Sequence, residues 1–128
     1  MQNKIRTIII DDEEEGRYIL QSMLSKFPEI EIIAVSGDAE SGLDVINRLK
    51  PDLVFLDIRM PQISGIDLAK QLIENQIYTS IVFVTAYDKF GVQAIKLAAF
   101  DYLLKPVDPD EIQRVISRYK KRKKPDNL

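Results

Sequence analysis

The sequence predicts an α/β fold, a doubly wound parallel sheet of five strands flanked by five helices. Short apolar or β-branched runs alternate with longer segments of helical periodicity along the chain. Three of these runs, at residues 5–10, 53–56 and 81–84, are apolar on both faces, which is typical of parallel strands covered by helices. The length of 128 residues and the 45% hydrophobic content fit one globular domain.

The first strand is predicted at residues 5–10, where a β-branched run ends abruptly at Asp11. A helical pattern follows, and one face of it is apolar: Ile19, Leu20, Met23, Leu24 and Phe27. Residues 30–35 are predicted to form the second strand. Asp38 is a predicted N-cap for the next helix, which Pro51 ends.

The third strand is predicted at residues 53–56 and ends at Asp57, and the fourth, at residues 81–84, ends at Thr85. The helix between them is predicted to face the sheet with three apolar residues: Leu68, Leu72 and Ile73.

A further helix is predicted at residues 88–98, although Gly91 in its interior costs about 1 kcal/mol relative to alanine. A last short strand, at residues 102–104, ends at Lys105. The final helix is predicted to start near Pro109, because proline is tolerated in a first turn. Its inner face is predicted from its apolar residues: Ile112, Val115, Ile116 and Tyr119.

The chain contains no cysteine and no histidine. Disulfides, zinc sites built on those residues, thiol nucleophiles and Ser-His-Asp triads are therefore excluded. Any bound metal must have oxygen ligands, which favours a hard cation such as Mg²⁺, Mn²⁺ or Ca²⁺. No apolar run approaches the roughly 18 residues that span a bilayer, and the start of the chain lacks the pattern of a secretory signal. We therefore expect a cytoplasmic protein without membrane contacts.

Charge is distributed unevenly along the chain. Residues 1–117 hold 12 Lys or Arg against 19 Asp or Glu, whereas residues 118–128 hold 6 against 1. The acidic body argues against a nucleic-acid surface on it. The basic run at residues 118–124 is interpreted as a helix end that leads into a linker, in preference to a patch that contacts DNA phosphates. We expect a domain at residues 1–120 and a basic linker or tail at residues 121–128.

Polar side chains follow four of the five predicted strands. Asp11 and Asp12 follow the first strand, Asp57 the third, Thr85 the fourth and Lys105 the fifth. Ligands of doubly wound sheets bind outside the carboxyl ends of the strands, so we expect these residues to share one rim. A solvated acidic turn before a helix would explain the first pair alone, but not the whole set.

Three carboxylates at one rim require a cation or a raised pKa. A few carboxylates with water in the remaining positions suit Mg²⁺. Metal, lysine and hydroxyl together can share the charge of a transferring phosphoryl group, with Asp57 as its nucleophile.

These residues give the chain a resemblance to the receiver domain of two-component response regulators, over about residues 4–120. The motifs that carry it are Asp11-Asp12, Asp57 with Met60-Pro61 and Gly65, Thr85-Ala86, and Lys105-Pro106. The resemblance implies the flavodoxin-like strand order 2-1-3-4-5. Residues 85–88 and 99–106 further resemble the LytR/AlgR type, in which the receiver precedes a LytTR DNA-binding domain.

The resemblance implies a site for phosphoryl transfer with Mg²⁺ or Mn²⁺. Asp57 is the implied phosphoacceptor, and the donor is a phosphohistidine of a sensor histidine kinase or phosphotransfer protein. Asp12, Asp57 and the backbone carbonyl of Arg59 are the implied metal ligands, with Asp11 acting through a bridging water. Thr85 and Lys105 are expected to bind phosphoryl oxygens.

The resemblance also implies a switch. Thr85 is expected to move toward the phosphoryl group while Tyr102 takes the space that it leaves, although a strand tyrosine is more often a packing residue. The bond before Pro106 is expected to be cis. The implied output is a homodimer through the fourth helix (residues 88–98), the fifth strand (residues 102–104) and the fifth helix, which starts near Pro109. DNA is then bound only by an effector domain outside this chain, and transcription is the controlled process.

Two positions that tune hydrolysis in the family are bulky in this chain, Arg59 and Tyr87. We therefore predict slow autodephosphorylation, because these side chains can exclude the attacking water. The protein is expected to be a switch, with no enzymatic activity beyond this self-catalysed chemistry.

Other classes of function fit less well. A phosphohydrolase of the haloacid-dehalogenase type would need a second aspartate at the position of Arg59. A phosphorylation-independent interaction module would not need the acidic set together with Lys105. A nucleotide-binding fold would need a glycine-rich loop after the first strand, which is absent.

Overall fold

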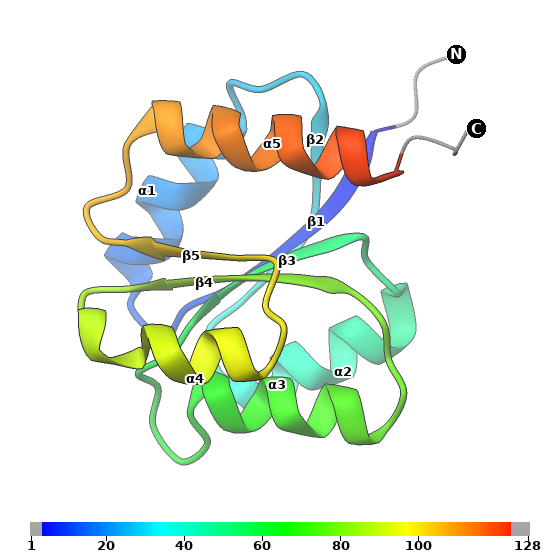
Figure 1. Cartoon of the computed structure of the whole chain (residues 1–128), viewed down its shortest axis with the longest axis vertical. Helices are drawn as coiled ribbons and strands as arrows, with labels where there is room; N and C mark the ends of the chain where they lie inside the picture. The colour runs from blue at the N-terminus through cyan, green and yellow to red at the C-terminus, as the bar shows by residue number, and fades with distance from the viewer. Residues whose placement is uncertain (1–3, 124–128) are drawn as a thin grey trace.

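The computed structural model describes residues 4–123 and shows a three-layer α/β fold (Figure 1). Its sheet has five parallel strands in the order β2-β1-β3-β4-β5, as predicted. Helices α1 and α5 cover one face of the sheet, and α2, α3 and α4 cover the other. The carboxyl ends of the strands therefore meet at a single rim.

The strands are β1 (Ile5–Ile10), β2 (Ile30–Ser36), β3 (Leu53–Asp57), β4 (Ser80–Thr85) and β5 (Asp101–Leu104). The helices are α1 (Glu14–Leu24), α2 (Ala39–Leu49), α3 (Gly65–Glu74), α4 (Gly91–Lys96) and α5 (Pro109–Lys123). A 3-10 turn, η1 (Asp88–Phe90), precedes α4. No helix within residues 4–123 is long and apolar enough to cross a membrane.

The central strand β3 is buried at all five positions, in agreement with its unbroken apolar pattern. Phe55 packs with α1 and α5 on one face, and Val54 and Leu56 pack with α2, α3 and α4 on the other. Alternate residues of one strand thus contribute to two separate cores, and β3 is fixed from both sides. This packing also fixes the position of Asp57, the last residue of the strand.

The helix starts agree with local sequence. Asp38 caps α2, because its carboxylate accepts a hydrogen bond from the Ser41 N–H at 2.7 Å. Ser64 caps α3 in the same way, through the Asp67 N–H at 3.1 Å. These caps satisfy amide donors that have no partner within the helix.

Two apolar residues assigned to inner helix faces are exposed: Ile19 by 50% and Ile73 by 49%. In both helices the neighbouring residue, Leu20 or Leu72, takes the inward position. Successive helix residues point about 100° apart, so the stripe that faces the sheet includes only one of each pair.

The helix predicted at residues 88–98 is much shorter than expected. Gly91 is the first residue of α4, not an interior one, so the predicted interior cost does not apply. The chain leaves the helix at Ala98, whose φ of 57° is left-handed, and the Phe100 N–H bonds to the Ile81 carbonyl at 2.8 Å. The need to reach the sheet edge ends the helix, although alanines would continue it.

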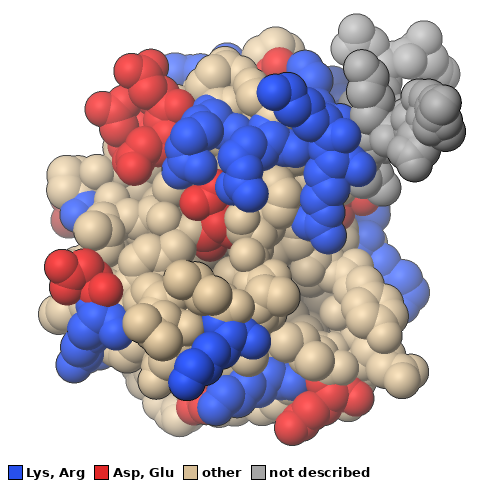
Figure 2. All heavy atoms as spheres, viewed as in Figure 1, with Lys and Arg blue, Asp and Glu red and all other residues tan. Residues whose placement is uncertain are grey.

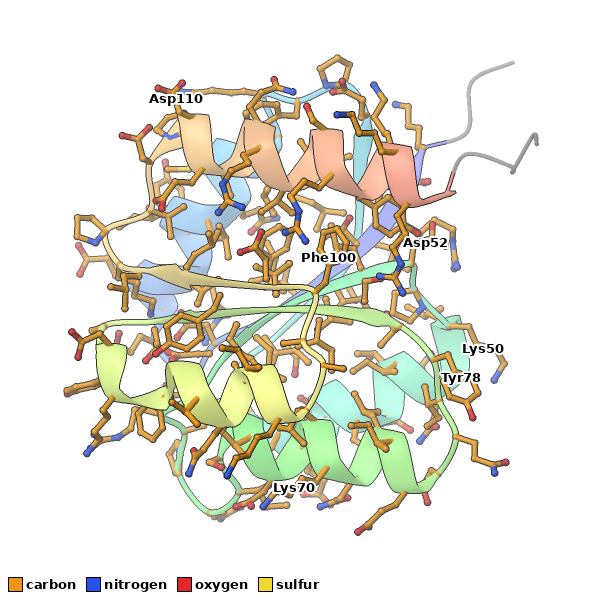
Figure 3. All side chains as sticks on the ribbon, viewed as in Figure 1. Lys50, Asp52, Lys70, Tyr78, Phe100 and Asp110 are labelled. Carbon is orange, nitrogen blue, oxygen red and sulfur yellow. The ribbon has the colours of Figure 1, made fainter. Side chains whose placement is uncertain are left out.

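Helix α5 extends to Lys123, three residues past the domain end expected at residue 120. Its predicted inner residues are all buried: Ile112, Val115, Ile116 and Tyr119. Lys and Arg side chains gather over this helix (Figure 2). Arg118 and Arg122 lie over the ring of Phe100, 4.6 and 5.3 Å from its centroid, and Phe100 is labelled beneath α5 in Figure 3. Part of the basic run is thus packed on the domain; residues 124–128 lie outside the described residues, and the linker stays a prediction.

Candidate functional site

The fold brings the predicted polar residues to the carboxyl-end rim of the sheet (left in Figure 1). Asp11 and Asp12 follow β1, and Asp57 ends the neighbouring strand β3. Thr85 ends β4, and Lys105 follows β5. Since these four strands are adjacent in the sheet, residues 94 positions apart in sequence come into contact.

Asp57 lies at the centre of this rim and is 5% exposed. Its Oδ2 accepts a hydrogen bond from Lys105 Nζ at 3.1 Å, and its Oδ1 accepts one from the Arg59 N–H at 3.2 Å. Gly65 packs against its backbone, since a Cβ at Gly65 would lie 2.1 Å from the Asp57 carbonyl oxygen. The start of α3 can therefore approach the end of β3 only because residue 65 has no side chain.

Asp11 is also buried, at 3% exposure. Its Oδ2 accepts a hydrogen bond from Lys105 Nζ at 2.9 Å, and its Oδ1 accepts one from the Glu13 N–H at 2.9 Å. Gly16, on the first turn of α1, makes room for this carboxylate, because a Cβ there would lie 2.5 Å from Oδ2. Lys105 thus bonds to two buried acids at once; the peptide bond from Lys105 to Pro106 is cis.

Asp11, Asp12 and Asp57 can each place one carboxylate oxygen within 4.8 Å of the others. Two carboxylates about 5 Å apart repel each other by about 3 kcal/mol at an effective dielectric of 20. One lysine cannot neutralise three acids, so a divalent cation would stabilise the group. Hard oxygen donors at this spacing fit Mg²⁺, which prefers one or two carboxylates and keeps several waters.

Burial raises the pKa of Asp57 from 3.8 to about 6; the ammonium of Lys105 lowers it, and the neighbouring Asp11 adds to the rise. Burial of Lys105 opposes its charged form, but its bonds to Asp11 and Asp57 raise the pKa of this amine above the ordinary value. At neutral pH the site therefore holds an ionised, partly desolvated carboxylate beside a firmly charged ammonium.

Thr85 is fully buried, and its hydroxyl accepts a hydrogen bond from the Tyr87 N–H at 3.4 Å. The Tyr102 hydroxyl donates to the Tyr87 carbonyl. Tyr102 is therefore connected to Thr85 through the backbone of one residue of the β4–η1 loop. The Tyr102 hydroxyl thus bonds to the β4–η1 loop and not to Asp11 or Asp57.

Two pairings at the rim were not foreseen from the sequence. The Arg59 guanidinium lies over the ring of Tyr87, 4.6 Å from its centroid. Arg17, on α1, donates from Nη1 to the Asp11 carbonyl at 2.7 Å. The bulk of Arg59 and Tyr87 in the sequence pointed to these two positions. Nothing in the sequence indicated the bond from Arg17 to Asp11, because it depends on how α1 lies relative to the turn after β1.

The sequence model of the family described as "Response regulator receiver domain" matches residues 7–117. A protein from Vibrio cholerae named "Uncharacterized response regulatory protein" is 46% identical over 114 residues, which cover 89% of this chain and 48% of that protein. The Escherichia coli K12 protein named "Transcriptional regulatory protein BtsR" is 39% identical over 115 residues, which cover 89% and 47%. The chain spans about half the length of these curated relatives.

Solved structures agree in fold. The receiver domain of the response regulator NarL from Mycobacterium tuberculosis superposes with a TM-score of 0.85 at 26% identity, over 92% of this chain and 98% of that one. The response regulatory domain of MrkE from Klebsiella pneumoniae gives 0.82 at 30% identity, over 91% and 99%.

Proposed function

Because this chain belongs to the response regulator receiver domain family, we propose that Asp57 is its phosphoacceptor in a two-component phosphorelay. The chain is a receiver domain of a two-component response regulator, and the comparisons do not support a phosphohydrolase of the haloacid-dehalogenase type. A histidine kinase or phosphotransfer protein is the partner that this family implies.

The burial and contacts of Asp57 carry the proposal. Its carboxylate is ionised at neutral pH, and Lys105 lies 3.1 Å from it. An Asp57 oxygen attacks the phosphorus of the donor phosphohistidine. A P–O bond forms while the P–N bond breaks, and the leaving imidazole keeps the bond electrons. The product is an acyl phosphate on Asp57.

The other rim residues share the charge that develops. Lys105 donates to a phosphoryl oxygen in place of one carboxylate, and the Thr85 hydroxyl donates to another. Asp12, Asp57 and the Arg59 carbonyl would hold Mg²⁺, or Mn²⁺, and Asp11 would contact it through water. When bound, the ion neutralises negative charge on the carboxylates and phosphoryl oxygens.

A groove beside the site supports the proposal that the donor is a protein. Apolar residues line it from α1 and from the segment after Lys105: Ile19, Leu20, Met23, Pro106 and Val107. The groove also includes Asp11 and Lys105, so a protein seated in it would bring its phosphohistidine next to Asp57.

Thr85, Tyr87 and Tyr102 connect the site to the edge strand β5. When Thr85 turns toward a phosphoryl oxygen, it gives up its bond to the Tyr87 N–H, and Tyr102 follows the loop. The output surface would be α4, β5 and α5, where Val92, Ile95 and Leu104 are exposed. We propose homodimerisation through this face.

The wider setting is also part of the proposal. We place this receiver in a cytoplasmic transcription regulator of the LytR/AlgR type, with residues 121–128 leading toward a LytTR domain that binds DNA. The length of the relatives, about twice that of the matched region, supports a further domain, and the name "Transcriptional regulatory protein" of one of them supports a role in transcription. The LytR/AlgR type rests on the resemblance of residues 85–88 and 99–106 alone.

The acceptor role is tested by incubating the chain with radiolabelled acetyl phosphate and Mg²⁺. We expect one acid-stable, base-labile phosphoryl group per chain. No label is expected with Asp57→Asn or with a chelator, whereas Asp44→Asn on the exposed surface of α2 should label normally. Labelling of Asp57→Asn at the rate of the native protein, or many turnovers with an aryl phosphate, would contradict the proposal.

A further inference from the structure

Arg17 has no place in the chemistry proposed above, yet its side chain reaches the acidic pair. It lies one turn into α1, and its guanidinium extends back over the turn between β1 and α1. There Nη1 donates to the backbone carbonyl of Asp11 at 2.7 Å. An ordinary solvated arginine on a helix would contact neighbours on its own helix; this one holds a backbone group at the site.

The space for the guanidinium depends on a residue of a third element. Gly37 directly follows β2 at the same rim, and a Cβ on it would lie 2.9 Å from Nη1 and 3.4 Å from Cζ of Arg17. A methyl group at residue 37 would therefore crowd the guanidinium and shift it from its present position. Arg17 is thus confined between α1, the end of β1 and the end of β2.

The consequence falls on the peptide unit that joins Asp11 to Asp12. The Asp11 N–H donates to the Ser36 carbonyl at 3.1 Å, and the Asp11 carbonyl accepts from Arg17. Both backbone groups of Asp11 therefore have partners outside the turn. A change of the Asp11 ψ angle would carry this carbonyl away from Arg17 and would turn Asp12, with its carboxylate, relative to Asp11.

We propose that Arg17 is a positioning residue for the metal site, and that Gly37 leaves space for its guanidinium. Arg17 fixes the orientation of the Asp11–Asp12 peptide unit and adds a permanent positive charge behind the acids. It touches neither metal nor phosphoryl group. The inference rests on the proposed function, since it concerns the Mg²⁺ site of that function.

The test compares Arg17→Gln, Arg17→Lys and Gly37→Ala with Arg48→Gln, which removes an exposed cation from α2. The Kd for Mg²⁺ is measured by calorimetry, and the labelling rate with acetyl phosphate is measured against Mg²⁺ concentration. Loss of groups that orient metal ligands typically weakens metal binding about 10- to 100-fold. We expect about a 10-fold higher Kd for Arg17→Gln, a smaller rise for Arg17→Lys, and a labelling rate at saturating Mg²⁺ within about 2-fold of the native rate.

Gly37→Ala separates position from charge. It keeps the arginine but crowds the guanidinium, so a rise in the Mg²⁺ Kd of several-fold is expected there too. Without metal, the NMR chemical shift of the Asp12 amide proton reports the peptide unit directly. It should move in Arg17→Gln and Gly37→Ala and stay in place in Arg48→Gln.

Three results would overturn the inference: an unchanged Mg²⁺ Kd in Arg17→Gln, an equal rise in Arg48→Gln, or an unchanged Asp12 amide shift. A variant that unfolds is recognised by its thermal transition, and the more conservative Arg17→Lys then decides. Failure of the proposed function looks different, because the native chain itself would then take no label on Asp57.

Discussion

Asp57 combines two demands that oppose each other. A phosphoacceptor must be an ionised nucleophile, but its burial favours the neutral acid and raises its pKa to about 6. Lys105 partly compensates for the burial, from a position where it also bonds to Asp11. The acceptor carboxylate therefore costs stability in the metal-free protein, and this cost is measurable.

We predict that Asp57→Asn stabilises the metal-free protein at pH 7.5 by about 1 to 3 kcal/mol. Because the pKa of Asp57 is about 6 in the folded state and 3.8 unfolded, the folded state binds the proton more tightly. The cost of the charged carboxylate is thus complete above pH 6 and disappears as the pH falls toward 3.8. Urea unfolding at pH 7.5 and pH 5 should show a gain about half as large at pH 5.

The control for this comparison is Asp44→Asn, whose carboxylate is exposed on α2. It should change the free energy of unfolding little at either pH. An Asp57→Asn variant that is less stable than the native chain at pH 7.5 would show that the bond to Lys105 outweighs burial.

The contact between Arg59 and Tyr87 leads to a prediction for the lifetime of the acyl phosphate. Because Arg59 stacks on Tyr87 and lies two residues after Asp57, we predict that the pair excludes water and that Arg59→Ala and Tyr87→Ala each shorten the lifetime about 3-fold. The acyl phosphate of the double variant should be only slightly shorter-lived than that of either single variant, because each substitution removes the same contact. Phosphate release after donor removal measures this, with Lys89→Ala, which removes a cation from η1, as control.

A half-life of seconds in the native chain would contradict the predicted slow hydrolysis. Fully additive losses in the double variant would show that Arg59 and Tyr87 act separately.

Three of the strand ends were predictable because Asp11, Asp57 and Thr85 each follow an unbroken apolar run that is typical of a buried strand, whereas Lys105 follows the short edge strand β5, where Leu104 is 41% exposed. Their meeting at one rim follows from the parallel sheet. The stacking of Arg59 on Tyr87 and the reach of Arg17 to Asp11 were not predictable. Long side chains have many rotamers, and tertiary neighbours select among them.

Among the elements, α3 and α4 use glycine at their first residue for different reasons. Gly65 lies against the Asp57 backbone, whereas a Cβ at Gly91 would meet nothing within 4 Å. The start of α3 is fixed by the close approach of Gly65 and by the Ser64 cap. The helix predicted at residues 88–98 was too long at both ends, because Asp88–Phe90 forms a 3-10 turn and the path into β5 ends α4 at Lys96. Sequence periodicity reports the faces of a helix better than its ends.

We predict that Gly65→Ala destabilises the protein by about 2 kcal/mol or more, since backbone must move to admit the methyl group. It should also slow labelling of Asp57, because the end of β3 shifts with it. Gly91→Ala is the matched control and should be neutral or stabilising by about 0.5 kcal/mol. Equal free energies of unfolding for the two variants would contradict the close packing at Gly65.

At the scale of the whole molecule, phosphorylation must change the ratio of the active to the inactive conformation of the domain. A change from 1:99 to 99:1 needs about 5.5 kcal/mol of differential stabilisation. A phosphoryl group brings roughly two negative charges and three acceptor oxygens to Lys105 and Thr85, which can supply energy of this size. A second copy of the chain can bind the exposed apolar residues of α4 and β5 and so distinguish the two conformations.

We predict that beryllofluoride with Mg²⁺ converts the chain from monomer to dimer in light scattering, and that Ile95→Glu prevents this. Ile95 is 78% exposed on α4. Tyr78→Ser is the control, because Tyr78 is 85% exposed beyond the opposite ends of the strands (right in Figure 3). Identical masses with and without beryllofluoride would count against dimerisation driven by phosphorylation.

Lys105 joins the sheet edge to its interior. Lys105 follows the edge strand β5, and its ammonium bonds to Asp11 at the end of β1. Strands β3 and β4 lie between these two strands in the sheet. Any anion attached to Asp57 competes with the carboxylates of Asp11 and Asp57 for the three protons of this ammonium, which bonds to both acids. The NMR signal of Lys105 Nζ labelled with a nitrogen isotope would therefore report whether the acceptor is occupied, because isotope labelling leaves the amine chemically unchanged.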